Sequence, residues 1–164
     1  MALINRILVP VDFSAGSRAA LRYAASIAEK FDASIEAFHV WEPLPYVAPS
    51  QMVWMGSEPD EFWKQYKVAA EERLSLLVRT EVPAAAERVA LRVEAGYPSG
   101  SILDRLDTEA FDMVVMGTRG LTGLKHLLLG SVAERVVQRA KCPVLTLHAP
   151  PKEEEGEEGA GKSA

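Results

Sequence analysis

Apolar residues along this chain alternate between short continuous runs and longer stretches with helical spacing. The first run, Ile4 to Val11, is apolar at nearly every position and is too short for a helix. A strand that is apolar throughout is covered on both faces, as the central strands of parallel sheets are. Four later runs predict further strands: Ser34 to Val40, Val89 to Glu94, Asp112 to Met116 and Pro143 to Leu147.

The stretches between these runs predict helices. After Ser14, a favourable N-cap residue, apolar residues recur every three or four positions from Ala19 to Ala28, Tyr23 among them. Similar spacing predicts three more helices, the first with Asp60 as its cap: Asp60 to Arg79, Ser99 to Leu106 and Ser131 to Ala140. Strict alternation of strands and helices predicts an α/β fold, an open five-stranded parallel sheet with helices on both faces (Rossmann-like and doubly wound).

Ligands of such sheets bind beyond the carboxyl ends of the strands, where the strand order reverses. Three segments leave those ends: Pro10 to Ser14, the segment after Val40, and Gly117 to Gly130. We expect the functional site among them. The segment Trp41 to Pro59 is long and has four prolines and several aromatic residues. It either folds its aromatic side chains onto its own domain or serves as a lid or partner surface.

The composition narrows the function classes. The 164 residues have a net charge of −5, of which Lys152 to Ala164 hold −3, so the body of the chain is near neutral. That balance gives no electrostatic case for binding nucleic acid or an anionic membrane surface. Cys142 is the single cysteine, and neither a signal peptide nor a run of about 18 apolar residues occurs. We expect a cytoplasmic protein in which residues 1–149 form one domain and residues 150–164 a disordered acidic tail.

The strongest chemical signal is a glycine-rich segment between a predicted strand and a predicted helix. It reads Gly117-Thr-Arg-Gly120, then nine residues, then Gly130-Ser131. Glycines let phosphate oxygens approach backbone N–H groups, and the start of a helix favours an anion. The segment is neither a Walker A loop nor a Gly-x-Gly-x-x-Gly fingerprint. It predicts a phosphate-binding loop, and the alternative is that the glycines make only a tight loop and a helix start.

Asp12, at the end of the first predicted strand, is the second candidate. A carboxylate in this position accepts hydrogen bonds from ribose hydroxyls in other nucleotide-binding folds. The alternative is that Asp12 only caps the following helix, a role that also suits Ser14.

These segments together resemble the universal stress protein family. The matching residues are Ile7-Leu8-Val9-Pro10-Val11-Asp12, Met116-Gly117-Thr118-Arg119-Gly120, Leu129-Gly130-Ser131-Val132-Ala133-Glu134-Arg135-Val136 and Cys142-Pro143-Val144-Leu145. The resemblance spans about residues 3–148. The glycine spacing is similar to that of the family's ATP-binding branch at every defined position, including Ser131.

The resemblance implies a ligand, site residues and a partner. The ligand would be ATP, with Mg²⁺ or Mn²⁺ able to accompany its phosphates. Asp12 would contact the ribose or adenine side. The adenine pocket would be lined by Pro10, Val11 and Val40, with Met116 nearby. The triphosphate would be held by Gly117, Arg119, Gly120, Gly130, Ser131 and Val132. The family usually forms homodimers through its last strand, here Val144 to Leu147, and an unpaired apolar edge gives that pairing a physical reason.

The implied function is an ATP-binding regulatory protein of the stress response, a dimeric module whose state depends on the nucleotide. Two other interpretations are an interaction protein that uses the Trp41–Pro59 segment without nucleotide, and a slow ATPase or nucleotidyl-transfer enzyme. A hydrolase needs a nucleophile, a base and an orienting group. The three histidines, His39, His126 and His148, suit packed or solvated roles better than catalytic ones, and Cys142 suits a buried structural thiol. No zinc-ligand spacing occurs in the sequence.

Overall fold

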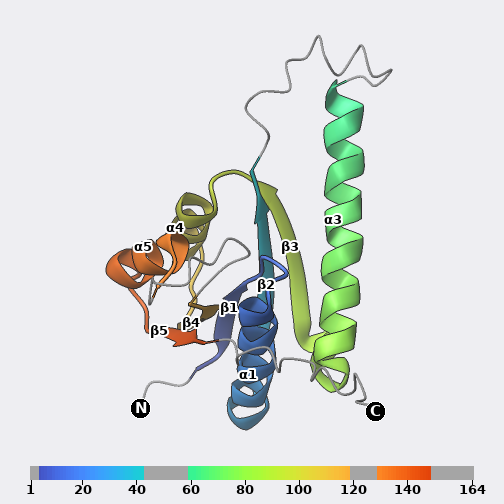
Figure 1. Cartoon of the computed structure of the whole chain (residues 1–164). Coiled ribbons are helices and arrows are strands. Elements are labelled where there is room, and N and C mark those ends of the chain that lie inside the picture. The colour runs from blue at the N-terminus through green and yellow to red at the C-terminus, as the bar shows by residue number, and fades with distance from the viewer. Residues whose placement is uncertain (1–3, 43–58, 119–128, 149–164) are drawn as a thin grey trace, which may run out of the picture.

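A parallel sheet runs through the centre of the molecule (Figure 1). In the computed structural model, which describes residues 4–42, 59–118 and 129–148, the strands are β1 (Arg6–Pro10), β2 (Ser34–Trp41), β3 (Val89–Ala95), β4 (Met113–Gly117) and β5 (Val144–Leu147). They pair in the order β3-β2-β1-β4-β5, and each pair is parallel. The predicted five-stranded sheet is confirmed, with strand ends shifted by one or two residues.

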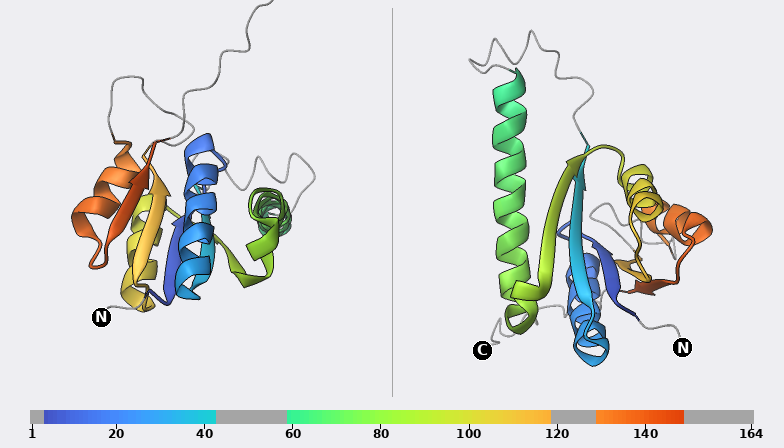
Figure 2. Two further views of the ribbon diagram at one scale, coloured as in Figure 1. Left: turned by 90° about the horizontal axis from the view of Figure 1, so that it is seen from below. Right: turned by 180° about the vertical axis from the view of Figure 1, so that it is seen from behind.

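Helices cover both faces of this sheet, as the sequence predicts. One face packs against α1 (Ala15–Phe31) and α3 (Pro59–Glu81), and the other against α4 (Pro98–Thr108) and α5 (Ser131–Arg139) (Figure 2). A short 3₁₀ turn, η1 (Pro83–Arg88), precedes β3 and has no counterpart in the sequence prediction. Within the described ranges, no helix is long and apolar enough to cross a membrane.

The predicted Asp60 cap is wrong. The helix α3 begins at Pro59, so Asp60 lies inside its first turn. Proline is favoured in a first helical turn, because the N–H that it lacks would have no partner there.

The two central strands show why their sequences are apolar throughout. In β1, Ile7 and Val9 pack on the α1 side of the core, whereas Leu8 packs on the α4 and α5 side, and all three are fully buried. In β4, Val115 and Val114 divide between the two sides in the same way. Successive side chains of a strand point to opposite faces, so a strand covered on both faces needs apolar residues at every position.

The ends of α1 follow from its sequence. The Ser14 hydroxyl oxygen accepts a hydrogen bond from the Ser17 N–H at 3.2 Å, which confirms the predicted N-cap. Asp32 ends the helix in a left-handed conformation, with φ of 55°. Tyr23 departs from the expected buried stripe, because its side chain is 49% exposed while Ala20 and Ala24 are buried.

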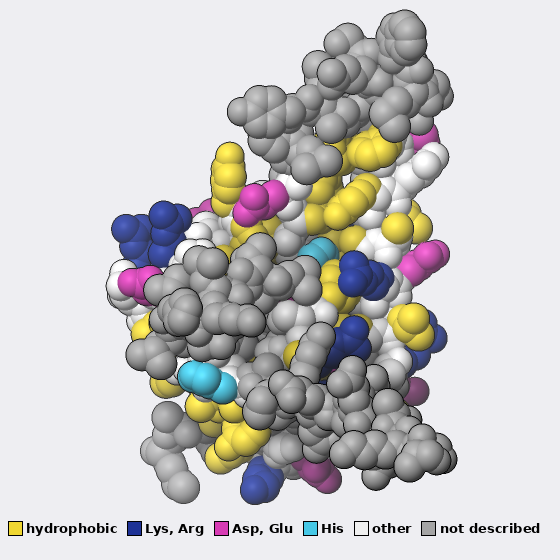
Figure 3. Space-filling model, in the orientation of Figure 1, with side chains coloured by type: hydrophobic (Ala, Val, Ile, Leu, Met, Phe, Trp, Pro, Cys, Tyr) yellow, Lys and Arg dark blue, Asp and Glu magenta, His cyan; other side chains and the backbone are white. Residues whose placement is uncertain are grey.

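The helix α3 extends past the end of the sheet (Figure 1). There Trp41 of β2 stacks on Trp63, with ring centroids 5.1 Å apart, and its ring also contacts Tyr66. Phe62 lies edge-on against Trp63. Figure 3 shows hydrophobic side chains gathered over this part of the molecule. Trp41 is the last residue of β2, and the aromatic residues that follow it in the long connection lie within residues 43–58, outside the described ranges. Both interpretations of this segment therefore stay predictions.

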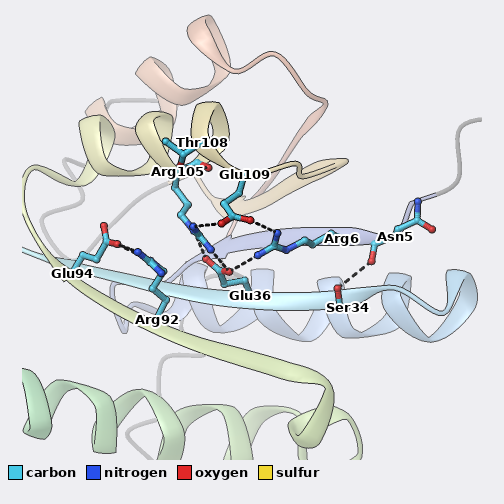
Figure 4. A network of polar contacts seen from close by, with 9 residues as sticks. All are labelled: Asn5, Arg6, Ser34, Glu36, Arg92, Glu94, Arg105, Thr108 and Glu109. Carbon is cyan, nitrogen blue, oxygen red and sulfur yellow. Dashed lines mark hydrogen bonds and ion pairs between the residues drawn. The ribbon is translucent and has the colours of Figure 1, made fainter.

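A buried carboxylate links three elements on the α4 side of the sheet. Glu36 of β2 is 4% exposed and accepts hydrogen bonds from Arg105 of α4 at 2.7 and 2.8 Å and from Arg6 of β1 at 3.0 Å (Figure 4). Both guanidinium groups also pair with Glu109. Burial opposes ionisation of Glu36, but hydrogen bonds and charge from Arg105 and Arg6 outweigh it and hold its pKa below the usual value.

Candidate functional site

The strand order reverses between β1 and β4. The chain leaves β1 toward α1 on one face of the sheet and leaves β4 toward α5 on the other. A crevice forms where two such connections diverge, and ligands of open α/β sheets bind there. The structure has a cavity of about 370 Å³ at this point, lined by residues of β1, β2, β4, α4 and α5 and the turns that follow or precede them. Its volume is within the range of small-molecule sites.

Nine of the eleven residues expected from the sequence line this cavity. They are Pro10, Val11, Asp12, Val40, Met116, Gly117, Gly130, Ser131 and Val132. The other two, Arg119 and Gly120, lie outside the described residues. Three segments that are far apart in the sequence therefore meet in one place, while the contact of each residue with a ligand stays a prediction.

Six lining residues were missed by the sequence reasoning: Phe38, Glu42, Pro98, Ile102, Thr118 and Ala133. Phe38 lies two positions before Val40 on the same face of β2, so strand alternation could have found it. Thr118 belongs to the glycine-rich segment itself. The α4 residues Pro98 and Ile102 carry no such signal, because only the tertiary packing places α4 beside the cavity.

The inner wall of the cavity is apolar. The side chains of Phe38, Ile102 and Met116 are at most 4% exposed. Pro10 and Val40 are half-buried beside them. An apolar wall with few polar groups accommodates a flat ring and excludes water from it.

The other end of the cavity is the N-terminus of α5. Gly130 precedes the helix with φ of −74° and ψ of 158°, and as a glycine it has no side chain to cap the helix. The Gly130 N–H is already used, because it donates to the Thr118 carbonyl oxygen at 2.6 Å. The N–H groups of Ser131 and Val132 open the first turn, where helical N–H groups have no intrahelical partner. Unpaired N–H groups and the positive end of the helix dipole suit an anion.

Gly117 has a structural reason to be glycine that the sequence did not reveal. A Cβ atom at this position would lie 2.8 Å from the carbonyl carbon of Gly16 and 3.1 Å from the Ser17 nitrogen. Its φ is outside the left-handed region, so a special backbone conformation is not the reason. The residue lets the end of β4 pack directly on the first turn of α1, while its other side faces the cavity.

Asp12 contributes to the loop as well as to the cavity wall. Its Oδ1 accepts hydrogen bonds from the Ser14 N–H at 3.0 Å and from the Ser14 hydroxyl at 2.5 Å. Ser14, not Asp12, is the N-cap of α1. Among the described residues, Oδ2 of Asp12 has no hydrogen-bond partner, so this oxygen is available to a ligand.

The titratable side chains that line the described part of the cavity are Asp12 and Glu42. Among the residues that the structure describes, no group of three or more His, Cys, Asp or Glu side chains could hold a metal ion. Cys142 does not line the cavity, and burial raises the pKa of its thiol, which favours the inert protonated form. The cavity thus offers an apolar wall, backbone donors and two carboxylates.

The sequence model of the universal stress protein family matches residues 4–148. The universal stress protein MJ0531 of Methanocaldococcus jannaschii is 36% identical over 158 residues, which cover 92% of this chain and 86% of that protein. The solved structure of the hypothetical protein MJ0577 has a TM-score of 0.74 at 23% identity, and the match covers 92% of this chain and 99% of that one. A universal stress protein solved in complex with cAMP has a TM-score of 0.61 at 21% identity, covering 91% and 100%. These structures confirm the fold, and the match over most of the sequence shows that the chain belongs to the universal stress protein family.

Proposed function

We propose that this protein is an adenine-nucleotide-binding regulatory module of the stress response, with ATP as its ligand. The observation that supports this best is the combination of two surfaces in one cavity, an apolar wall and the N-terminus of α5, whose N-cap residue has no side chain. A nucleotide has the same two parts, a flat base and anionic phosphate. The family member solved with cAMP, whose ligand is an adenine nucleotide, adds support.

Each part of the nucleotide has a candidate surface. The adenine ring would lie against Pro10, Val11, Val40 and Met116, and Asp12 would accept a hydrogen bond from the ribose through Oδ2, the oxygen that does not bond to Ser14. The phosphates would meet the first turn of α5. The residues proposed for them are Gly117, Arg119, Gly120, Gly130, Ser131 and Val132, with Arg119 and Gly120 assigned from the motif alone.

Mg²⁺ or Mn²⁺ would arrive with the phosphates. A nucleotide cation is commonly held by the phosphates with one or two protein oxygens and its own waters. The described residues offer no carboxylate cluster that would hold the ion by itself. We therefore expect metal binding to depend on the nucleotide.

The cavity supports binding better than turnover. One oxygen of Asp12 is committed to Ser14, and no lysine or histidine lines the described part of the cavity. A slow ATPase is the second candidate, because the exposed carboxylate of Glu42 lies at the rim of the cavity and could accept a proton from water. The two candidates differ in whether phosphate is released from bound ATP.

We also propose a homodimer formed through β5 and a cytoplasmic location. The strand β5 is the last strand at one edge of the sheet, and its four residues are half-buried in the single chain. Exposed strand edges favour pairing with another chain. The lone cysteine fits a reducing compartment.

The test uses two matched variants at the start of α5. The backbone angles of Gly130 suit Asp and Asn, which are both good N-cap residues. Gly130→Asp would place a carboxylate where phosphate is proposed, whereas Gly130→Asn would add a similar cap without charge. Calorimetry with ATP, ADP and AMP in the presence of Mg²⁺ should show micromolar binding by the native protein. ATP affinity should fall by about tenfold or more in Gly130→Asp and by less in Gly130→Asn.

Thermal denaturation is the control for this test. Both variants should be at least as stable as the native protein, because a capped helix is more stable than an uncapped one. Unchanged ATP affinity in a folded Gly130→Asp variant would remove the α5 terminus from the site.

A further inference from the structure

The loop that presents Asp12 to the cavity is also hydrogen-bonded to β2. Residues 11–14 join β1 to α1, and both backbone groups of Val11 bond to β2. The Val11 N–H donates to the Phe38 carbonyl oxygen at 2.8 Å, and the Val11 carbonyl oxygen lies 2.7 Å from Nδ1 of His39. A carbonyl oxygen only accepts, so Nδ1 of His39 holds a proton and donates it in this bond. His39 does not line the cavity.

Phe13, the next residue after Asp12, has an unfavourable backbone conformation. Its φ is 65°, in the left-handed region that bulky residues rarely adopt, and its side chain is buried. Such a conformation is unfavourable for a residue other than glycine and persists only where its surroundings fix it. The ring of Phe13 lies 4.6 Å from the His39 ring, centroid to centroid, and the Arg73 guanidinium carbon of α3 lies 4.0 Å from the Phe13 ring centroid.

Burial is the main reason that the His39 ring is neutral at neutral pH. Burial lowers the pKa of His39, and the positive charge of Arg73 on α3 lowers it further. The bond to Val11 and the negative charge of Asp12 act in the opposite direction but do not outweigh burial. A neutral ring with its single proton on Nδ1 is a fixed donor to Val11.

We propose that His39 is a positioning residue that holds the Val11 carbonyl and, with the Phe13 ring, fixes the loop conformation in which Asp12 faces the nucleotide. The proposal rests on the proposed nucleotide-binding function, and in particular on the contact of Asp12 with the ribose. The helix α3 takes part through Arg73. The sugar side of the site thereby depends on side chains that do not touch the ligand.

Three variants of His39 separate positioning from simple packing. His39→Leu removes the donor, His39→Asn returns an N–H donor near the Nδ1 position, and His39→Gln places one near the Nε2 position. In the full chain, calorimetry should show that ATP affinity falls about fivefold in His39→Leu. His39→Asn should restore it to within about twofold, and His39→Gln should not.

A double-mutant cycle tests whether His39 acts through Asp12. In an Asp12→Ala background, His39→Leu should change ATP affinity by less than about twofold, because no carboxylate is left to be positioned. A loss in that background equal to the loss in the native background would overturn the proposal. So would equal affinities of His39→Asn and His39→Leu, or a His39→Leu variant that binds as tightly as the native protein.

Failure of the proposed function would be seen separately, as a native protein that binds no nucleotide. In that case the role of His39 is tested by NMR, from the backbone amide resonances of Asp12, Phe13 and Ser14 in the protein without ligand. They should shift in His39→Leu and return toward their native positions in His39→Asn, and resonances that do not move would overturn it. If His39→Leu does not fold, His39→Asn is compared with His39→Gln. The proposal expects the Asn variant to keep the native ATP affinity and native amide resonances and the Gln variant to lose them, and equal behaviour of the two would overturn it.

Discussion

At the scale of single residues, Gly117 of β4 lies against the backbone of the first turn of α1, and this contact predicts how a substitution there affects stability. A Cβ atom there would lie 2.8 Å from the carbonyl carbon of Gly16, which cannot move aside as the end of a flexible side chain could. We expect Gly117→Ala to lower the free energy of unfolding by about 2 kcal/mol, because β4 and α1 must separate to admit the methyl group. Chemical denaturation measures this directly.

Gly100 provides the matched control. It lies in the first turn of α4, and a Cβ atom there would meet nothing within 4 Å. Alanine favours a helix more than glycine does, so Gly100→Ala should raise the free energy of unfolding by about 0.5–1 kcal/mol. Opposite signs for the two substitutions would support the packing role of Gly117, and equal signs would contradict it.

Residue patterns predicted which positions meet, but not how each is used. The ends of the predicted strands and the family resemblance placed Gly117 and Asp12 in one site, and both line the cavity. The contact of Gly117 with Gly16 arises from tertiary packing and has no signature in the sequence. The bonds of Asp12 to Ser14 are local, because the two residues are two positions apart, and Asp commonly makes such bonds at a turn. The left-handed Phe13 is still less predictable, because local preference argues against it.

At the scale of elements, the Glu36 network joins β1, β2 and α4 and makes the stability of the fold depend on pH. The pKa of Glu36 is lower in the folded protein than its ordinary value of 4.5, so its contribution is complete above that pH and is lost as the pH falls through the folded value. Glu36→Gln should lower the free energy of unfolding at pH 7 by about 3 kcal/mol, because two guanidinium groups lose a buried partner. The difference from the native protein should shrink in acid.

Urea denaturation at neutral pH and through an acid series would measure this difference. Glu109→Gln is the control, since Glu109 pairs with the same two arginines but has a side chain 42% exposed. Its effect should be clearly smaller, because exposed ion pairs contribute little. A difference between Glu36→Gln and the native protein that stays constant at every pH would contradict the assigned role of the carboxylate.

Elements were predictable where burial on both faces leaves a continuous apolar run. The strands β1 and β4 are of this kind, and the sequence predicted both within two residues. The turn η1 and the projection of α3 past the sheet depend on how the chain connects α3 to the edge strand β3. No local sequence pattern encodes that connection. The position of α4, which brings Pro98 and Ile102 to the cavity, is a tertiary property of the same kind.

At the scale of the whole molecule, the proposed dimer depends on the free edge of β5. The carbonyl oxygens of Pro143 and Leu147 accept hydrogen bonds from residues of the β4 segment, so alternate residues of β5 face that strand. Thr146 precedes Leu147, so its backbone groups point the opposite way and its N–H is directed to the open edge of the sheet. Thr146→Pro should remove this donor without breaking the ladder to β4, and should convert a dimer to a monomer.

Light scattering after size exclusion measures the mass of each variant. Thr146→Ala keeps the N–H and should remain dimeric. A Thr146→Pro variant that is folded and still dimeric would place the interface elsewhere.

The nucleotide content of the purified protein tests the central claim most directly. The protein would be denatured, and the released small molecules separated by chromatography and quantified against the protein concentration. We expect an adenine nucleotide, with ATP as the main species, or uptake of ATP to one per chain when the protein is supplied with ATP and Mg²⁺. A folded protein that releases no nucleotide and takes up none would contradict the claim, and would leave the cavity between β1 and β4 without its proposed ligand.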